Sequence, residues 1–257
     1  MLLELDHVDK IFGGLHAVKA VSVRVEPGEI FGLIGPNGAG KTTIFNVVTG
    51  VYRPDGGRVL FDGKDISGWK PAQVAAAGIG RTFQNIRLFR SMTVEQNVMV
   101  SGHRLHGVGL LGTILRSARL SACERQLRNR AHELLEALGL RDQANDMAGS
   151  LPYGSQRRLE IARALMLSPQ LLLLDEPAAG MNSQEARELE AQIRWLRDEL
   201  KVTVVLVEHN MSVVMSVCER IAVMDHGETI ADGPPSVIKT HPKVIAAYLG
   251  QEEPGDR

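Results

Sequence analysis

The chain has 257 residues, enough for one large domain, or a domain with an inserted lobe, around a sizeable core. With 44% hydrophobic residues, 23% charged residues and a net charge of −1, the composition is that of an ordinary soluble globular protein. It excludes the basic excess of nucleic-acid-binding chains and the charge block of an acidic tail. Cys123 and Cys218 have no metal-ligand or redox spacing, which favours a reduced, cytosolic compartment.

The first residues and the apolar runs bear on membrane insertion. Glu4 and Asp6 follow Met1-Leu2-Leu3 at once, so we expect no signal peptide. The longest apolar runs, 171–174 and 202–207, have the length of strands, whereas a helix needs about 20 residues to span a bilayer. Any membrane role is therefore expected to come through a partner protein.

The N-terminal third alternates between strand and helix patterns. Residues 3–8 and 21–25 alternate apolar and polar side chains, which predicts two half-buried strands. A short apolar strand at 31–34 runs into Gly35, and a helical pattern follows from Thr42 to about Val51. Further strands are predicted at 58–61 and 79–83, with a turn at 62–63 and a short helix that begins at Pro71.

The middle of the chain, from 84 to 165, is predicted to be mostly helical. Thr93 and Gln96 have capping-box spacing, so a helix is expected to begin there. Residues 103–115 carry several glycines and are expected to form a flexible connection, and 121–138 predict a long amphipathic helix that ends at Gly139. The α/β alternation then resumes, with strands at 171–174, 202–207, 221–224 and 228–231, a helix at 184–200 and a turn at 225–227. This order predicts an α/β core interrupted by a helical lobe.

Between the strand at 31–34 and the following helix lies the pattern G-x-x-x-x-G-K-[ST], which we call the phosphate loop. Its glycines let backbone N–H groups surround a polyphosphate, and the helix that follows adds the positive end of its dipole. In this pattern Lys41 reaches the β- and γ-phosphates and the Thr42 hydroxyl binds Mg²⁺. An ordinary glycine-rich turn is the alternative, but the strand–loop–helix context favours ATP. The candidate nucleotide-binding residues are Gly35, Pro36, Asn37, Gly38, Ala39, Gly40, Lys41, Thr42 and Thr43.

Two carboxylates follow the apolar run at 171–174. A buried parallel strand would bring Asp175 and Glu176 to the carboxyl edge of its sheet, where α/β sheets bind ligands. Asp175 would hold Mg²⁺ through water, and Glu176 would act as the general base on the attacking water. Strands often end in acidic residues, so the interpretation depends on the phosphate loop.

Taken together, these motifs resemble those of the nucleotide-binding subunits of ATP-binding-cassette (ABC) transporters, over essentially the whole chain. The resemblance implies a P-loop NTPase core at 1–83 and 166–235 with an N-terminal antiparallel β subdomain, an inserted helical subdomain at 84–165 and a C-terminal helical tail at 236–257. It implies that Gln84 senses Mg²⁺ and the membrane subunit, so that Thr42, Gln84 and Asp175 would be the Mg²⁺ residues. It also implies that His209 contacts the γ-phosphate, and it places Phe12 where an aromatic side chain stacks on adenine, although Phe12 could equally belong to the core.

A signature loop follows the helical lobe. Its residues resemble the family sequence L-S-G-G-Q and are Leu151, Pro152, Tyr153, Gly154, Ser155 and Gln156. Pro152 replaces the serine that contacts the γ-phosphate bound by the opposite subunit, and proline supplies neither a hydroxyl nor an N–H group. Either the branch tolerates this loss, which we favour, or the composite site is weakened. Asn182 stands where the family has aspartate and would cap the next helix.

The resemblance also implies partners and a transport class. Each ATP would lie between the phosphate loop of one subunit and the signature loop of another, which requires a sister cassette in a heterodimer or a second copy in a homodimer. The stretches 12–15, 81–89, 175–180 and 244–250 resemble the ATPases of bacterial branched-chain amino-acid importers. That branch implies two permease subunits as partners, a periplasmic binding protein as an indirect partner, and no nucleic acid. It also implies a cytoplasmic position on the inner face of the plasma membrane.

Other functions stay open at this point. Related urea or amide importers and lipopolysaccharide exporters carry similar ATPases. A soluble cassette ATPase of DNA repair or translation usually has two cassettes, a coiled coil or a basic arm, and this chain has none of these patterns. A P-loop kinase for a small metabolite would leave the signature loop and His209 without a role.

Overall fold

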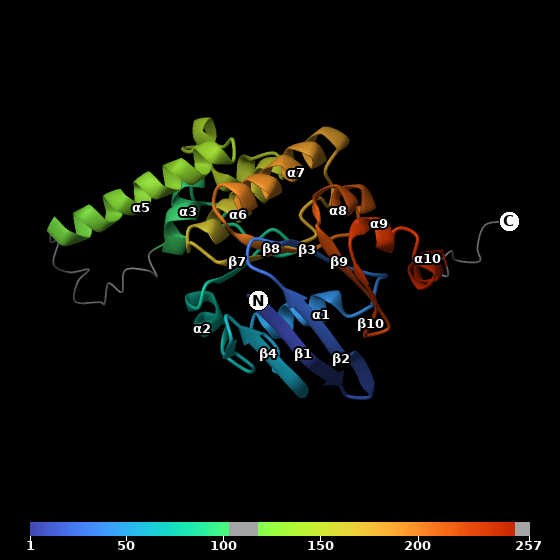
Figure 1. Ribbon diagram of the computed structural model, residues 1–257. Coiled ribbons are helices and arrows are strands. Elements are labelled where there is room, and N and C mark those ends of the chain that lie inside the picture. Colours follow the sequence, from blue (N-terminus) through green and yellow to red (C-terminus); the bar gives the residue numbers. More distant parts are fainter. Residues whose placement is uncertain (103–117, 250–257) are drawn as a thin grey trace.

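The central feature is a six-stranded sheet in the order β10-β9-β3-β8-β7-β6 (Figure 1). The computed structural model describes residues 1–102 and 118–249. Neighbouring strands of this sheet run parallel, except that β10 is antiparallel to β9. The strands are β3 (Ile30–Ile34), β6 (Ile79–Arg81), β7 (Leu171–Asp175), β8 (Thr203–Val207), β9 (Arg220–Asp225) and β10 (Glu228–Gly233). Such a sheet gathers the carboxyl ends of β3, β6, β7 and β8 at one edge.

A second, antiparallel sheet covers one side of the first, in the order β2-β1-β4-β5. It consists of β1 (Leu3–Phe12), β2 (Leu15–Val25), β4 (Gly56–Phe61) and β5 (Lys64–Asp65). Asp62 and Gly63, which join β4 to β5, have φ values of 49° and 70°. These are the left-handed conformations of a tight type I′ hairpin turn, in which Asp and Gly are favoured.

The helices lie on both sides of the central sheet. α1 (Lys41–Val48) lies between the two sheets, whereas α3 (Val94–Gly102), α5 (Ala118–Ala137), α6 (Tyr153–Leu165) and α7 (Ser183–Asp198) form a layer on the opposite side (Figure 1). The remaining elements are α2 (Pro71–Ala76), the short 3-10 helices η2 (Arg141–Gln143) and η3 (Ala148–Ser150), α8 (Met211–Val217), α9 (Pro235–Ile238) and α10 (Pro242–Leu249).

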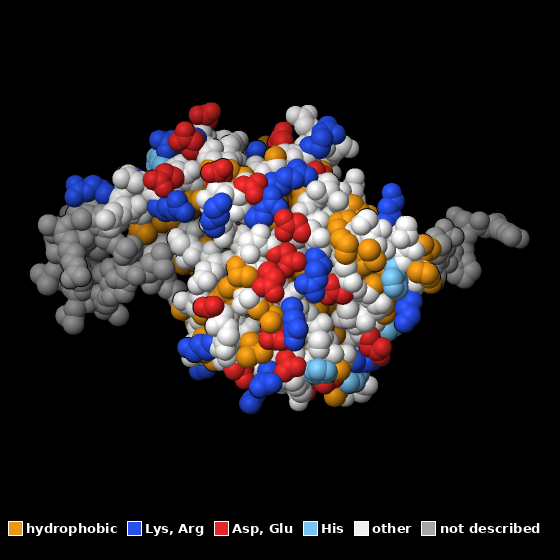
Figure 2. Space-filling model, viewed as in Figure 1, with side chains coloured by type: hydrophobic (Ala, Val, Ile, Leu, Met, Phe, Trp, Pro, Cys, Tyr) orange, Lys and Arg blue, Asp and Glu red, His pale blue; other side chains and the backbone are white. Residues whose placement is uncertain are grey.

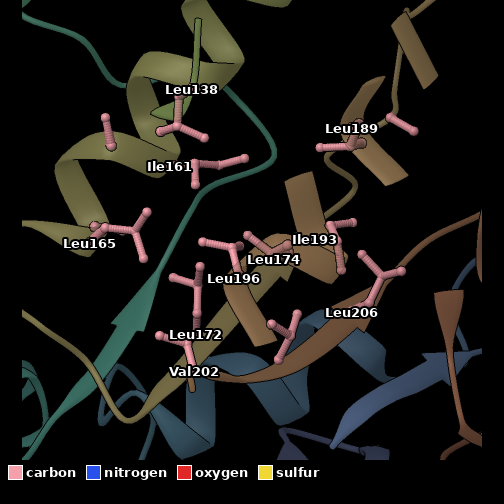
Figure 3. Packing of buried hydrophobic residues seen from close by; sticks show 14 of the residues in the cluster. Leu138, Ile161, Leu165, Leu172, Leu174, Leu189, Ile193, Leu196, Val202 and Leu206 are labelled. Atoms are coloured by element: carbon pink, nitrogen blue, oxygen red, sulfur yellow. The ribbon is translucent and has the colours of Figure 1, made fainter. Parts of the chain in front are cut away.

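The two faces of the central sheet bury two apolar clusters. Side chains alternate between the faces of a strand, so Leu172 and Leu174 point to the helical layer while Leu171 and Leu173 point to α1 and the small sheet. Figure 3 shows the first cluster, in which Leu174 and Leu206 of the sheet meet residues of α7 such as Ile193. The burial of β7 on both faces explains its unbroken apolar run.

Most predicted strands and helices are confirmed, and several differ in detail. The strand predicted at 79–83 ends at Arg81, and residues 84–92 contain no helix. The helix after the phosphate loop begins at Lys41 and ends at Val48, where Gly50 (φ 72°) closes it in a Schellman turn. The predicted helices at 121–138 and 184–200 span Ala118–Ala137 and Ser183–Asp198, and α8 was not predicted at all. The expected flexible connection at 103–115 lies outside the described residues. The subdomain boundaries stay a prediction.

Two surface observations complete the fold. Within the described residues, no helix is both long enough and apolar enough to cross a membrane. Acidic and basic side chains are interspersed over the face seen in Figure 2, which agrees with the near-neutral charge of the chain.

Candidate functional site

Four loops leave the same edge of the central sheet and carry the predicted residues. The phosphate loop follows β3, Gln84 lies beyond β6, Glu176 follows β7, and His209 lies two residues beyond β8. Because these strands are parallel, their carboxyl ends bring together side chains that are up to 174 residues apart in sequence.

The phosphate loop requires glycine at two close approaches. A Cβ atom on Gly35 (φ 148°) would stand 2.0 Å from the carbonyl oxygen of Met224. One on Gly40 (φ 103°) would stand 2.5 Å from the carbonyl oxygen of Ala17. Gly40 is also the N-cap of α1, so the free N–H groups of the first turn of the helix adjoin the loop. This backbone arrangement suits an anion.

Lys41 turns back into the phosphate loop. Its side chain is buried, and Nζ donates hydrogen bonds to the carbonyl oxygens of Gly35 (2.6 Å) and Pro36 (2.8 Å). Burial lowers the pKa of Lys41, and the nearby carboxylates of Glu176 and Asp175 oppose that shift. An ammonium group held in this way is placed to meet the negative charge of a phosphate.

Asp175 is held from below by an arginine that the sequence argument did not assign. Arg81 Nη2 lies 2.9 Å from Asp175 Oδ2, and the two side chains are only 8% and 2% exposed. Arg81 Nη1 also donates to Asn46 and Thr49 of the α1 region, at 2.7 and 3.2 Å. The pair therefore ties β6, β7 and α1 together beneath the phosphate loop.

We expect Arg81→Gln to lower the free energy of unfolding by about 3 kcal/mol, because it leaves the buried charge of Asp175 without its partner. The double variant Arg81→Gln/Asp175→Asn removes that uncompensated charge and should recover more than half of the loss. Urea unfolding followed by circular dichroism measures both. A single variant that loses less than about 1 kcal/mol would mean that the ion pair is not a stabilising feature of the site.

Glu176 is the residue on which the other loops converge. Gln84 Nε2 donates to Glu176 Oε2 at 3.0 Å, and His209 Nε2 lies 3.0 Å from Glu176 Oε1. The backbone of Glu176 is in the left-handed region (φ 48°), a strained conformation for a residue with a side chain. Its N–H donates to the carbonyl oxygen of Val207 at 2.8 Å, which holds this conformation at the end of β7.

Glu208 supports the site, and sequence reasoning missed it. It is 2% exposed, and Oε1 accepts the N–H of Ala178 at 2.6 Å. Oε2 accepts the N–H groups of His209 and Asn210, at 2.8 and 2.9 Å. Glu208 thus joins the loop after β8 to the loop after β7. Its place between the apolar run of β8 and His209 was the available sequence signal.

A cleft of about 660 Å³ opens above these loops. Most of the predicted residues line it: Phe12, Asn37, Gly38, Ala39, Gly40, Lys41, Thr42, Thr43, Gln84, Glu176 and His209. Gly35, Pro36 and Asp175 lie outside the lining, behind Lys41 and Arg81. His16 and His226 also line the cleft, although nothing in their sequence surroundings marked them. The cleft is thus bounded by the small sheet at one end and by Glu176 at the other.

Phe12 stands where a planar ligand can meet it. Its ring is 39% exposed at the cleft and makes an edge contact with Tyr52, with ring centroids 5.1 Å apart. Lys10 Nζ lies 5.3 Å from the centre of the Phe12 ring. An exposed ring of this kind offers a stacking surface, and its use by adenine stays a prediction.

The oxygen donors fit a magnesium ion that arrives with a polyphosphate. Asp175 Oδ1 is buried and has no hydrogen-bond partner among the described residues, so it is available to an ion or its water. Thr42 supplies a hydroxyl and Gln84 an amide oxygen, and Mg²⁺ prefers such oxygen ligands. Among the described residues no group of three His, Cys, Asp or Glu side chains could hold a metal alone, so phosphate oxygens would have to complete the set.

The signature loop lies away from the cleft. Pro152 is the N-cap of α6 and makes no side-chain capping bond, and Tyr153 is 44% exposed. Pro152, Gly154 and Ser155 instead line a separate pocket of about 190 Å³, together with Met181 and residues of α7. The start of α6, which has no side-chain cap, therefore lines a pocket that contains no residue of the phosphate loop.

Asn182 caps α7 as predicted. Its Oδ1 accepts the N–H groups of Gln184 and Glu185, at 2.9 and 3.0 Å, and Glu185 Oε2 accepts the N–H of Asn182 at 2.9 Å. This reciprocal pair is a capping box.

Comparison with known proteins agrees with this geometry. Residues 18–179 match the family model described as ABC transporter, and residues 228–254 match the model described as branched-chain amino acid ATP-binding cassette transporter. The first of these covers more than half of the chain, from within β2 to the loop after Glu176.

Individual relatives extend over nearly the whole length. The chain is 46% identical to the high-affinity branched-chain amino acid transport ATP-binding protein BraF of Pseudomonas aeruginosa, over 97% of this chain and 98% of that protein. It is 44% identical, with the same coverage, to the protein LivG of Escherichia coli K12, which has the same description. Among solved structures, the ADP conformation of MJ1267, an ATP-binding cassette of an ABC transporter, aligns with a TM-score of 0.84 and 32% identity over 97% of this chain and 99% of that one.

Proposed function

Since this chain belongs to the ABC transporter family and is an ATPase of that family, we propose that the transport it drives is the uptake of branched-chain amino acids. The observation that carries the proposal is the meeting of phosphate loop, Gln84, Glu176 and His209 at one cleft, in a chain that matches relatives of that description from end to end. The match of residues 228–254 to the branched-chain amino acid model adds independent support at the C-terminus.

In the proposed mechanism, ATP lies in the cleft with its adenine against Phe12 and its phosphates in the phosphate loop. Lys41 and the N-terminal amides of α1 neutralise the β- and γ-phosphates. Thr42, Asp175 and Gln84 would hold Mg²⁺, which would supply positive charge to the phosphate oxygens. Lys41 gives up its contacts to Gly35 and Pro36 when the phosphate takes their place.

Glu176 is the proposed general base. It accepts the proton of the attacking water while the water oxygen bonds to the γ-phosphorus and the bond from that phosphorus to the β,γ-bridging oxygen breaks. ADP and phosphate then leave. His209 contacts both Glu176 and the γ-phosphate, so it orients the carboxylate toward the water. Gln84 holds the other carboxylate oxygen, and thereby gives Glu176 a defined position before the nucleotide binds.

The signature loop would complete the site of a second cassette. The start of α6 carries the free N–H groups of a helix N-terminus and lines a pocket separate from the chain's own cleft, which suits contact with a γ-phosphate bound elsewhere. Pro152 removes one hydroxyl from this contact but leaves the N–H groups of Tyr153 and Gly154. We therefore propose that ATP joins two cassettes, either two copies or this chain and a sister chain, and that hydrolysis separates them.

A groove beside Gln84 is the proposed contact for the permease. It has a volume of about 400 Å³ and is lined by Phe83, Arg87 and Arg163, among others. Arg87 is exposed at this groove, and Arg163 contributes a second guanidinium group to the lining. Cationic groups of this kind suit a polar or acidic helix from a membrane subunit, which would hold the chain at the cytoplasmic face of the plasma membrane.

Amino-acid uptake by the organism that carries the gene tests the transport class directly. Deletion of the gene should abolish high-affinity uptake of radiolabelled leucine, isoleucine and valine, and the wild-type gene should restore it. A gene that encodes the Glu176→Gln variant should not restore uptake, because transport requires ATP hydrolysis. Labelled urea and acetamide serve as controls. If the deletion stops urea or acetamide uptake and leaves leucine uptake unchanged, the chain serves a related importer instead.

A further inference from the structure

The first turn of α6 holds the backbone that carries Gln84. Arg157 is 3% exposed, and its guanidinium donates to the carbonyl oxygens of Phe83 through Nη1 (2.7 Å) and of Gln84 through Nη2 (2.5 Å). These are charge-assisted hydrogen bonds in a buried setting, where they are strong. Two consecutive carbonyl groups of the loop after β6 are thus fixed to one side chain of α6.

Glu160, one turn further along α6, holds the same segment from its N–H side. Its Oε1 accepts the N–H of Phe83 at 3.2 Å, and its Oε2 lies 3.4 Å from Arg157 Nη1. Burial raises the pKa of Glu160, while the Phe83 N–H and the charge of Arg157 act in the opposite direction. The Phe83–Gln84 peptide therefore follows any movement of α6.

The side chain of Gln84 passes this constraint on to the proposed base. Its Nε2 donates to Glu176 Oε2 at 3.0 Å, across 92 residues of sequence. A continuous path of hydrogen bonds therefore leads from Arg157 through the Gln84 backbone and side chain to Glu176.

Tyr153 connects this path to two further loops. Its hydroxyl accepts hydrogen bonds from Arg157 Nε (3.2 Å) and Nη2 (2.9 Å). Its ring lies against the loop after β7, because a Cβ atom on Gly180 would stand 3.4 Å from Tyr153 Cε1. A glycine at position 153 could make neither contact, so the tyrosine is more than a tolerated departure from the signature pattern.

We propose that Tyr153 and Arg157 are positioning residues that link the signature loop and the loop after β7 to Gln84, and so set the place of Glu176. The inference rests on the proposed role of Glu176 as the base. Only a guanidinium can serve, because its five N–H groups reach two carbonyls, a carboxylate and a hydroxyl at once, whereas the lysine ammonium has three.

Steady-state ATP hydrolysis by the full-length chain tests the link through Arg157→Lys and Tyr153→Phe. We expect kcat to fall about tenfold in Arg157→Lys and about threefold in Tyr153→Phe, because the first disturbs the bonds to both carbonyl groups whereas the second removes only those to the hydroxyl. The KM for MgATP should stay within about twofold in both, since neither residue lines the nucleotide cleft. Arg130→Lys is the matched control, because Arg130 lies on α5 and within the described part of the chain pairs with Glu133, away from the cleft.

The decisive measurement repeats each variant in a Gln84→Ala background. If Arg157 and Tyr153 act through Gln84, each should then change kcat by less than about twofold. If each variant lowers kcat by the same factor in the Gln84→Ala background as in the wild-type background, Arg157 and Tyr153 do not act through Gln84 and the proposal is wrong. Tyr153→Phe keeps the ring and removes only the hydroxyl of a half-exposed side chain, so it decides the question even if Arg157→Lys does not fold. Glu176→Gln separates failure of this inference from failure of the proposed function. If Glu176→Gln still hydrolyses ATP normally, Glu176 is not the base. If Glu176→Gln is inactive but the other variants lower kcat equally in both backgrounds, only the connection through Gln84 is wrong.

Discussion

Glu176→Gln should bind ATP about as tightly as the wild-type chain and hydrolyse it about a thousandfold more slowly. Glutamine keeps the size and planarity of the side chain but cannot accept a proton from water. Both carboxylate oxygens are engaged, one with Gln84 and one with His209. Neutral imidazole can donate or accept through Nε2, so His209 can also meet the new NH₂ group. The variant therefore tests chemistry with little change in packing.

Binding of a fluorescent ATP analogue and release of phosphate measure the two halves of this expectation. Glu133→Gln is the matched control, because Glu133 is exposed on α5 and its ion pair among the described residues is with Arg130. We expect the control to retain full turnover. Gel filtration with ATP should in addition detect dimers of Glu176→Gln, since the nucleotide that joins two cassettes is no longer consumed. Turnover of Glu176→Gln within tenfold of the wild type would assign the base to another residue.

The parts of the fold that were predictable from sequence are those encoded by local patterns. The unbroken apolar run of β7 predicted a strand buried on both faces, and the glycines before Lys41 predicted a loop that wraps an anion. Parallel pairing then places the ends of β3, β7 and β8 together, so a cleft at this edge followed from strand order alone. Thr93 and Asn182 were predicted as helix caps because capping depends on residues only three apart in sequence.

The parts that escaped prediction depend on long-range contacts. Arg81 and Glu208 look like ordinary charged residues in sequence, and only the pairing of β6, β7 and β8 buries them against Asp175 and Ala178. Helix α8 has seven residues, which is less than two full turns. A helix this short does not show a clear apolar periodicity in the sequence. The strand β6 ends early because Phe83 and Gln84 are bound by Arg157 of α6 and not by the neighbouring strand. No local signal announces such a partner 73 residues away.

Lys41→Ala should weaken ATP binding about a hundredfold and abolish measurable turnover, because it removes the one ammonium group that faces the phosphates from within the loop. Lys41 is held by the carbonyl oxygens of Gly35 and Pro36, and burial lowers its pKa. The ammonium group of Lys41 is therefore poorly solvated by water. Phosphate oxygens that bind it would supply the favourable interactions that burial removes. The loss of ATP affinity in Lys41→Ala should therefore exceed the loss that follows removal of an exposed lysine, because water competes with phosphate for an exposed ammonium group.

The stability of the same variant distinguishes this account from simple unfolding. Removing Lys41 relieves the desolvation of its ammonium group but leaves the carbonyls of Gly35 and Pro36 without a donor, and these effects oppose each other. We expect the free energy of unfolding to change by less than about 1 kcal/mol. Lys41→Met, which keeps the apolar stem, should lose ATP affinity equally, because the charge and not the packing is what binds phosphate. If Lys41→Met retains wild-type affinity, the amides of the loop and the α1 dipole alone hold the nucleotide.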